Sequence, residues 1–160
     1  MTPSRFSIPR DKRYLEDYRT GDLFEYGPVA VTAEEIVAFA KEFDPQTIHI
    51  DPIGAAAGPF AGLIASGWHT TCLIMRLFVD NYVSDIASRA SPGMDEIRWY
   101  VPVRPGDTLT LRVTVLEARP SRSKPDRGIV HSLLEAFNQK GEKVMSVKAM
   151  NLFAKREIVT

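Results

Sequence analysis

A periodic apolar face marks the first helical segment of the chain. Its apolar residues recur at the spacing of one side of a helix: Ile36, Phe39, Ala40 and Phe43. Thr32 precedes them and Glu35 follows it by three residues, which is the pattern of a capping box at a helix start. Pro45 disfavours helical geometry at Asp44. The pattern therefore predicts a helix that begins at Thr32 and ends in a firmly held Asp44.

A second helix is predicted from about Ser66 to about Asn81, and it is apolar on most sides. Charge appears in it only at Arg76 and Asp80, which is typical of a helix in a protein core. Residues 52–75 carry no formal charge and are long enough to span a bilayer. However, glycines and prolines recur in this stretch and would leave backbone groups unpaired in lipid. We therefore expect a buried loop followed by a buried core helix.

After the second helix, the apolar period changes to that of strands. Residues 108–115 alternate between apolar and polar side chains, as a half-buried strand does. The other strand candidates are residues 95–103, 129–138 and 144–153, and an earlier one at 23–31 that Gly27 and Pro28 interrupt. Turn-forming residues lie at 104–107 and 138–143, and residues 118–128 are a polar connection.

The order of these elements predicts the fold class. A strand, a small helix and a buried helix precede four strands, which we expect to form a meander. An antiparallel β-sheet wrapped around a central buried helix is an α+β domain. Residues 1–20 are interpreted as an N-terminal arm anchored by Tyr14, Leu15 and Tyr18, and residues 21–160 as the domain itself.

Composition narrows the classes of function. The 160 residues suffice for one domain with a substantial core. Twenty basic and twenty acidic side chains cancel, so no bulk attraction to nucleic acid or to an anionic membrane is expected. Cys72 is the single cysteine, which fits a reducing compartment, and the polar N-terminus lacks the apolar core of a secretion signal. We expect a cytoplasmic protein.

The candidate chemistry lies just after the first helix. Asp44 and His49 are five residues apart on one connection. A carboxylate and an imidazole there can share a water molecule, as general acid–base catalysis requires. In the alternative interpretation, Asp44 caps a turn and His49 is satisfied by backbone groups. No metal is expected, because the three histidines, His49, His69 and His131, show no paired ligand spacing.

Residues 44–52 and 60–67, DPQTIHIDP and FAGLIASG, resemble the MaoC-like (R)-specific enoyl-CoA hydratase/dehydratase family. The resemblance covers roughly residues 20–155, and it implies the hotdog fold and reversible hydration of trans-2-enoyl thioesters to 3-hydroxyacyl thioesters. It places the catalytic residues at Asp44 and His49. It places the amide that faces the thioester carbonyl at Gly67. Residues assigned to substrate binding are Gln46, Phe60, Ser66 and Trp68. Gln46 stands where asparagine is usual in the family, and Thr47 replaces a proline.

The family likeness also implies a substrate carrier and an assembly. The acyl group would be carried by coenzyme A or acyl carrier protein, with no cofactor. Phosphates of the carrier have candidate contacts at Arg122, Lys124 and Arg127, although these residues also fit a solvated turn. By analogy with the fold, we expect a homodimer or a dimer of dimers. Two alternatives remain open, a hotdog acyl-CoA thioesterase and a non-catalytic acyl-thioester-binding protein.

Overall fold

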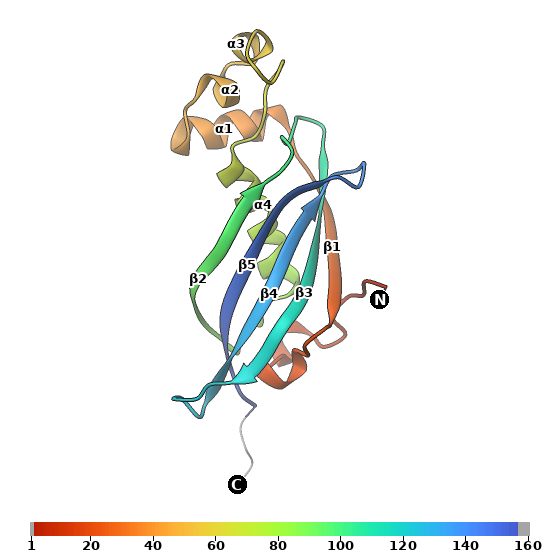
Figure 1. Ribbon diagram of the computed structural model, residues 1–160, viewed down its shortest axis with the longest axis vertical. Helices are drawn as coiled ribbons and strands as arrows, with labels where there is room; N and C mark the ends of the chain where they lie inside the picture. The colour runs from red at the N-terminus through yellow and green to blue at the C-terminus, as the bar shows by residue number, and fades with distance from the viewer. Residues whose placement is uncertain (1, 157–160) are drawn as a thin grey trace.

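A five-stranded antiparallel sheet curves around one long helix in the computed structural model, which describes residues 2–156 (Figure 1). The strands are β1 (Leu23–Ala30), β2 (Ser88–Trp99), β3 (Thr108–Pro120), β4 (Arg127–Phe137) and β5 (Lys143–Ala154). The helices are α1 (Ala33–Phe43), α2 (Thr47–Ile50), α3 (Pro52–Ala56) and the long α4 (Gly67–Asn81). This arrangement is the α+β architecture predicted from the sequence, a hotdog domain.

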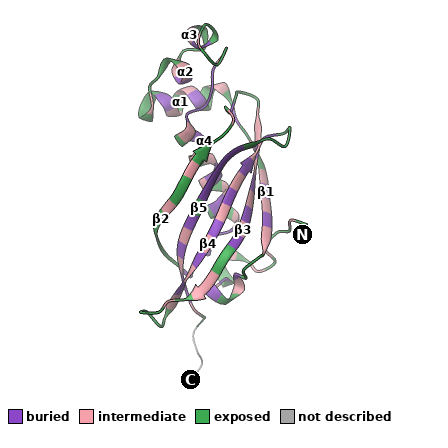
Figure 2. Cartoon of the chain, viewed as in Figure 1, coloured by how far each residue is buried: buried purple, intermediate pink, exposed green. Residues whose placement is uncertain are grey.

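The core lies between the concave face of the sheet and α4. The inward side chains of β3 are Leu109, Leu111, Val113 and Val115, and all are fully buried. Helix α4 contributes Ile74 and Phe78, which are equally buried. Figure 2 shows buried and partly exposed residues alternating along β3 and β4. The apolar residues at every second position of β3 and β4 are therefore those on the face of the sheet that packs against α4.

The strand order corrects one prediction. The sheet runs β1-β3-β4-β5-β2, so only β3, β4 and β5 form a meander. Strand β2 lies at the far edge and pairs with β5, with Trp99 opposite Met145. Strand β2 also begins earlier and ends earlier than the predicted residues 95–103, and β3 extends into the predicted polar connection. Local alternation identifies a strand, but it carries no information about its partner.

Burial around the helices also differs from the prediction. Residues 52–61 are mostly exposed and contain α3, whereas a buried loop was expected. Phe43, the last member of the apolar face of α1, is 65% exposed. Helix α4 has one uncovered side, where Trp68 is 54% and Val79 is 38% exposed. Within residues 2–156, no helix is long and apolar enough to cross a membrane.

The N-terminal arm packs against the end of the domain that lies away from α1, α2 and α3 (Figure 1). Leu15 and Tyr18 are buried in the core. Arg13 is also buried, and its Nη1 donates hydrogen bonds to the carbonyl oxygens of Asn81 and Tyr82 at 2.9 and 2.6 Å. The arm therefore satisfies backbone carbonyls at the C-terminal end of α4.

Candidate active site

The end of α1 and the short helix α2 bring Asp44 and His49 together. The amide of Asp44 still donates to the Ala40 carbonyl at 2.8 Å, so Asp44 is the last position that α1 holds. Helix α2 then reverses the chain, with the His49 amide donating to the Gln46 carbonyl at 2.8 Å. The sequence predicted a simple connection here. Two short helices form instead. Pro45 and Pro52 disfavour helical geometry at Asp44 and Asp51, which end α1 and α2, and Pro52 then fits the first position of α3.

The side chains of Asp44 and His49 face each other and are close enough to hydrogen-bond to the same water molecule. Asp44 Oδ2 lies 3.4 Å from His49 Nε2. On the other side of the ring, His49 Nδ1 lies 2.7 Å from the carbonyl oxygen of Ile64. A carbonyl only accepts hydrogen bonds, so the neutral ring carries its hydrogen on Nδ1 and a lone pair on Nε2. Two acceptors thus point at one place, where the two hydrogens of a water molecule would satisfy both.

Neighbouring donors keep Asp44 ionised. Gln46 Nε2 donates to Asp44 Oδ1, and Ser66 Oγ donates to Asp44 Oδ2, each at 2.7 Å. These two hydrogen bonds lower the pKa of the Asp44 carboxyl below its usual value. Ser66 also accepts from the Trp68 amide as the N-cap of α4, at 3.2 Å. One hydroxyl therefore ties the start of α4 to the carboxylate.

A mostly apolar cavity of about 290 Å³ adjoins His49. Its lining comes from the segment before α4, the start of α4, the end of β2 with the residues that follow it, and the start of β5. The lining residues other than His49 are Phe60, Ile64, Ala65, Gly67, Thr70, Trp99, Tyr100, Val101, Pro102, Val103 and Val144. Phe60 therefore lines the same cavity as His49. Trp68 does not line this cavity, because its side chain is turned outward and meets the edge of Trp99, with ring centroids 5.6 Å apart.

Gly67 begins α4 beside this cavity. Within residues 2–156 its amide has no hydrogen-bond acceptor, as expected of a free helix N-terminus. The indole of Trp99 lies so close that a Cβ at position 67 would meet Trp99 Cε2 at 2.6 Å. Position 67 therefore requires glycine for packing, and the same amide remains available to a ligand oxygen. The sequence offered no signal for Trp99, whose contact with α4 depends on how β2 lies on the helix.

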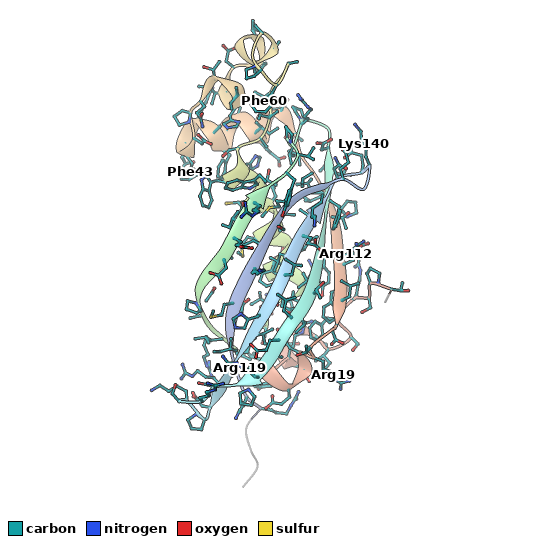
Figure 3. All side chains as sticks on the ribbon, viewed as in Figure 1. Arg19, Phe43, Phe60, Arg112, Arg119 and Lys140 are labelled. Atoms are coloured by element: carbon teal, nitrogen blue, oxygen red, sulfur yellow. The ribbon has the colours of Figure 1, made fainter. Side chains whose placement is uncertain are left out.

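The basic residues predicted to contact phosphates lie elsewhere. Arg122 and Lys124 are in the β3–β4 turn, and Arg127 begins β4, where it pairs with Asp126 at 2.8 Å. Figure 3 shows Arg119, next to this turn, and Phe60, at the cavity, at opposite ends of the molecule. Within one chain, the structure does not bring this turn to the Asp44–His49 pair.

Comparison with known proteins identifies the family. The model of the MaoC like domain matches residues 19–135. The chain belongs to the MaoC-like dehydratase family. A MaoC-like dehydratase from Rhodospirillum rubrum is 40% identical, covers 91% of this chain and 99% of its own, and superposes with a TM-score of 0.82. The Bacillus subtilis protein YdeM is 36% identical over 81% of this chain and 91% of its own length.

A hydratase is also among the similar structures. The R-hydratase PhaJ1 from Pseudomonas aeruginosa is 25% identical and superposes with a TM-score of 0.71. The match covers 90% of this chain and 86% of that protein. The family thus includes hydratases and dehydratases, enzymes of the hydro-lyase kind.

Proposed function

We propose that this MaoC-like protein catalyses reversible hydration of trans-2-enoyl thioesters to 3-hydroxyacyl thioesters. The observation that carries the proposal is the pair of acceptors, Asp44 Oδ2 and His49 Nε2, 3.4 Å apart beside an apolar cavity. The Ile64 carbonyl selects the histidine tautomer that leaves Nε2 free to accept. A water bound between them is oriented and polarised, and an enoyl group in the cavity would lie next to it.

The proton movements follow from the chemistry of the two groups. An imidazole is a stronger base than a carboxylate whose pKa is lowered by hydrogen bonds. We therefore assign proton acceptance to His49 Nε2 as the water oxygen bonds to the β-carbon. Asp44 holds the second hydrogen of the water and stabilises the imidazolium. The imidazolium then returns its proton to the α-carbon from the same side, which makes the addition syn and leaves both residues as they began.

The thioester oxygen gains negative charge during this reaction. The start of α4 is suited to stabilise it, because the free Gly67 amide and the helix dipole both favour an anion there. Addition of water changes no oxidation state, so the proposed reaction needs no cofactor beyond the carrier of the acyl group. Coenzyme A and acyl carrier protein are both compatible carriers.

The test is the hydration of crotonyl-CoA, followed by loss of absorbance of the conjugated thioester. Asp44→Asn and His49→Gln should each lower kcat by about 10²- to 10⁴-fold, as expected for loss of a general acid–base group. Asp51→Asn is the matched control, because Asp51 is an exposed carboxylate of the same segment that caps the Ile53 amide. Folded variants of Asp44 and His49 with undiminished activity would refute the proposal.

Two additional measurements separate the other classes of function. Release of free coenzyme A from saturated acyl-CoA, without hydration of enoyl-CoA, would identify a thioesterase. Binding of acyl-CoA without turnover of any enoyl or hydroxyacyl substrate would identify a binding protein.

We also infer a homodimer that forms along β2. Within residues 2–156, β2 pairs with β5 on one side only, which leaves its other backbone edge open. The uncovered side of α4 presents Trp68, Cys72 and Val79. A second copy would extend the sheet and cover these apolar side chains in a two-fold contact. Sedimentation that finds only an active monomer at micromolar concentration would contradict this inference.

A further inference from the structure

Arg104 lies beside the cavity, next to two of its lining residues. It directly follows Val103, a lining residue in the β2–β3 connection. Its Nη2 donates to the carbonyl oxygen of Phe60, a lining residue of the segment before α4, at 2.7 Å. The Val103 carbonyl also accepts from the Ala65 amide at 2.8 Å. Arg104 therefore lies next to both lining residues and close to the segment that holds Ile64 and Ser66.

The positive charge of Arg104 has no carboxylate partner within residues 2–156. The acid of the same turn, Asp107, is engaged otherwise. Its Oδ2 accepts from the backbone amide of Arg104 at 2.8 Å, and its Oδ1 accepts from Gln139 Nε2 at 2.8 Å. A guanidinium has five N–H donors, and the Phe60 carbonyl takes one of them. Because the side chain is exposed, the remaining donors are accessible to a ligand.

Among residues 2–156, the side chains that line the cavity include no lysine or arginine, and apolar side chains predominate. For a ligand with an apolar part in the cavity and an anionic part outside it, Arg104 is an exposed cation beside the lining residues Phe60 and Val103. The planar guanidinium suits oxyanions, because two parallel N–H groups match two oxygens of a phosphate or carboxylate.

We propose that Arg104 binds an anionic group of the substrate beside the cavity. This proposal rests on the proposed function, and it extends that function to the part of the substrate that does not react. Thioester substrates carry oxyanions in two places. One is the phosphate of the carrier, in coenzyme A or in a phosphopantetheine arm. The other is a carboxylate at the far end of a dicarboxylic acyl chain.

In the competing interpretation, Arg104 has only a structural role, because its hydrogen bond to the Phe60 carbonyl holds Phe60 in place. Substrate truncation separates the two roles. Crotonyl-CoA carries phosphates, whereas crotonyl-N-acetylcysteamine has the same reacting atoms and no phosphate. An N-acetylcysteamine thioester of a trans-2-enedioic acid carries a carboxylate and no phosphate. If Arg104 binds an anion, its replacement weakens the reaction of anionic substrates only. If Arg104 only positions Phe60, its replacement affects all three substrates.

The variants are Arg104→Gln, which removes the charge, and Arg104→Lys, which keeps the charge and loses the planar fork. Arg19→Gln is the matched control, because Arg19 is exposed and lies at the opposite end of the molecule from Phe60 (Figure 3). Arg122→Gln separately tests the phosphate contacts predicted in the β3–β4 turn. Arg104→Gln should raise KM for the anionic substrate roughly 5- to 20-fold, as for loss of a charged hydrogen bond. Its kcat should stay within about twofold, and KM for crotonyl-N-acetylcysteamine should not change. Arg104→Lys should fall between Arg104→Gln and wild type.

The pattern of effects identifies the anion or overturns the proposal. An increase in KM for crotonyl-CoA identifies the carrier phosphate, and one confined to the carboxylate-bearing thioester identifies the acyl chain. Equal effects on all substrates, or none on any, would overturn the proposal. Calorimetric titration with coenzyme A and with the free trans-2-enedioic acid is independent of turnover. If wild type hydrates no substrate, the proposed function fails, and weaker binding of either titrant to Arg104→Gln still supports anion binding by Arg104. Unchanged binding of both would then overturn it.

Discussion

The contact between Gly67 and Trp99 predicts that Gly67→Ala destabilises the wild-type protein but not a variant that lacks the Trp99 side chain. A Cβ added at position 67 would lie 2.6, 2.7 and 3.0 Å from three carbons of the Trp99 indole. Carbon atoms in contact normally lie about 3.5–4.0 Å apart, so the indole has to move by about 1 Å. It is held by a hydrogen bond from Nε1 to Thr71 Oγ1 at 3.3 Å and by the edge contact with Trp68.

Gly67→Ala should therefore destabilise the protein. Overpacking of this kind costs about 1–3 kcal/mol, and we expect about 1–2 kcal/mol because Trp99 is 45% exposed and can yield. At this chain length, that corresponds to a fall in Tm of about 2–8 °C. In a Trp99→Ala background the clash is absent. Alanine in the first turn of α4 should then be neutral, or stabilising by up to about 1 kcal/mol, because it restricts the unfolded chain more than glycine does.

The assay is urea unfolding of wild type, the two single variants and the double variant, which together form a double-mutant cycle. A coupling energy of about 1–3 kcal/mol is expected between the two positions. Additive effects would refute the reasoning, because they would mean that the requirement for glycine at position 67 does not come from Trp99. Thermal unfolding of the same four proteins should give the same order of stability.

Two further predictions concern pH and assembly. His69 is buried and stacked on Phe39, and burial lowers the pKa of its imidazole from 6.5. The contribution of neutral His69 to the free energy of unfolding is therefore complete above about pH 6.5, and it is lost as the pH falls through the lower pKa of the folded state. Urea unfolding at about pH 7.5 and 5.5 should show a larger loss for wild type than for His69→Phe, and equal losses would contradict this assignment. Val79→Glu on the uncovered side of α4 should shift sedimentation from dimer to monomer, whereas Leu116→Glu, at an exposed apolar position of β3, should not. A dimer that survives Val79→Glu would place the contact elsewhere.

Local sequence signals were sufficient for much of the architecture. The capping box forms as predicted, with Thr32 Oγ1 accepting from the Glu35 amide at 3.2 Å and the Glu35 carboxylate reaching back. Helix α4 and the alternating part of β3 also lie where the spacing predicted them. These features depend on residues within one or two turns of one another, so the chain carries them without reference to the rest of the fold.

The Asp44–His49 pair is intermediate between local and tertiary structure. Its five-residue separation on one connection placed both groups near each other from the sequence alone. Their orientation depends on residues farther along the chain. The Ile64 carbonyl holds the ring nitrogen of His49, and the Ser66 hydroxyl holds the carboxylate. The spacing of apolar and polar residues in the sequence does not indicate which backbone carbonyl will accept a hydrogen bond from a histidine.

By itself, the amino-acid sequence determined the capped start of α1, the position of α4, the alternating buried face of β3, and the short segment that carries the acid and the histidine. The tertiary structure alone decided that β2 lies at the sheet edge beside β5, that Trp99 covers Gly67, and that Arg104 reaches the carbonyl of Phe60 beside the cavity. The reason is physical. Periodicity and capping are settled between neighbours along the chain, whereas strand partners and cavity walls are settled only when every element competes to bury its apolar face in the same core.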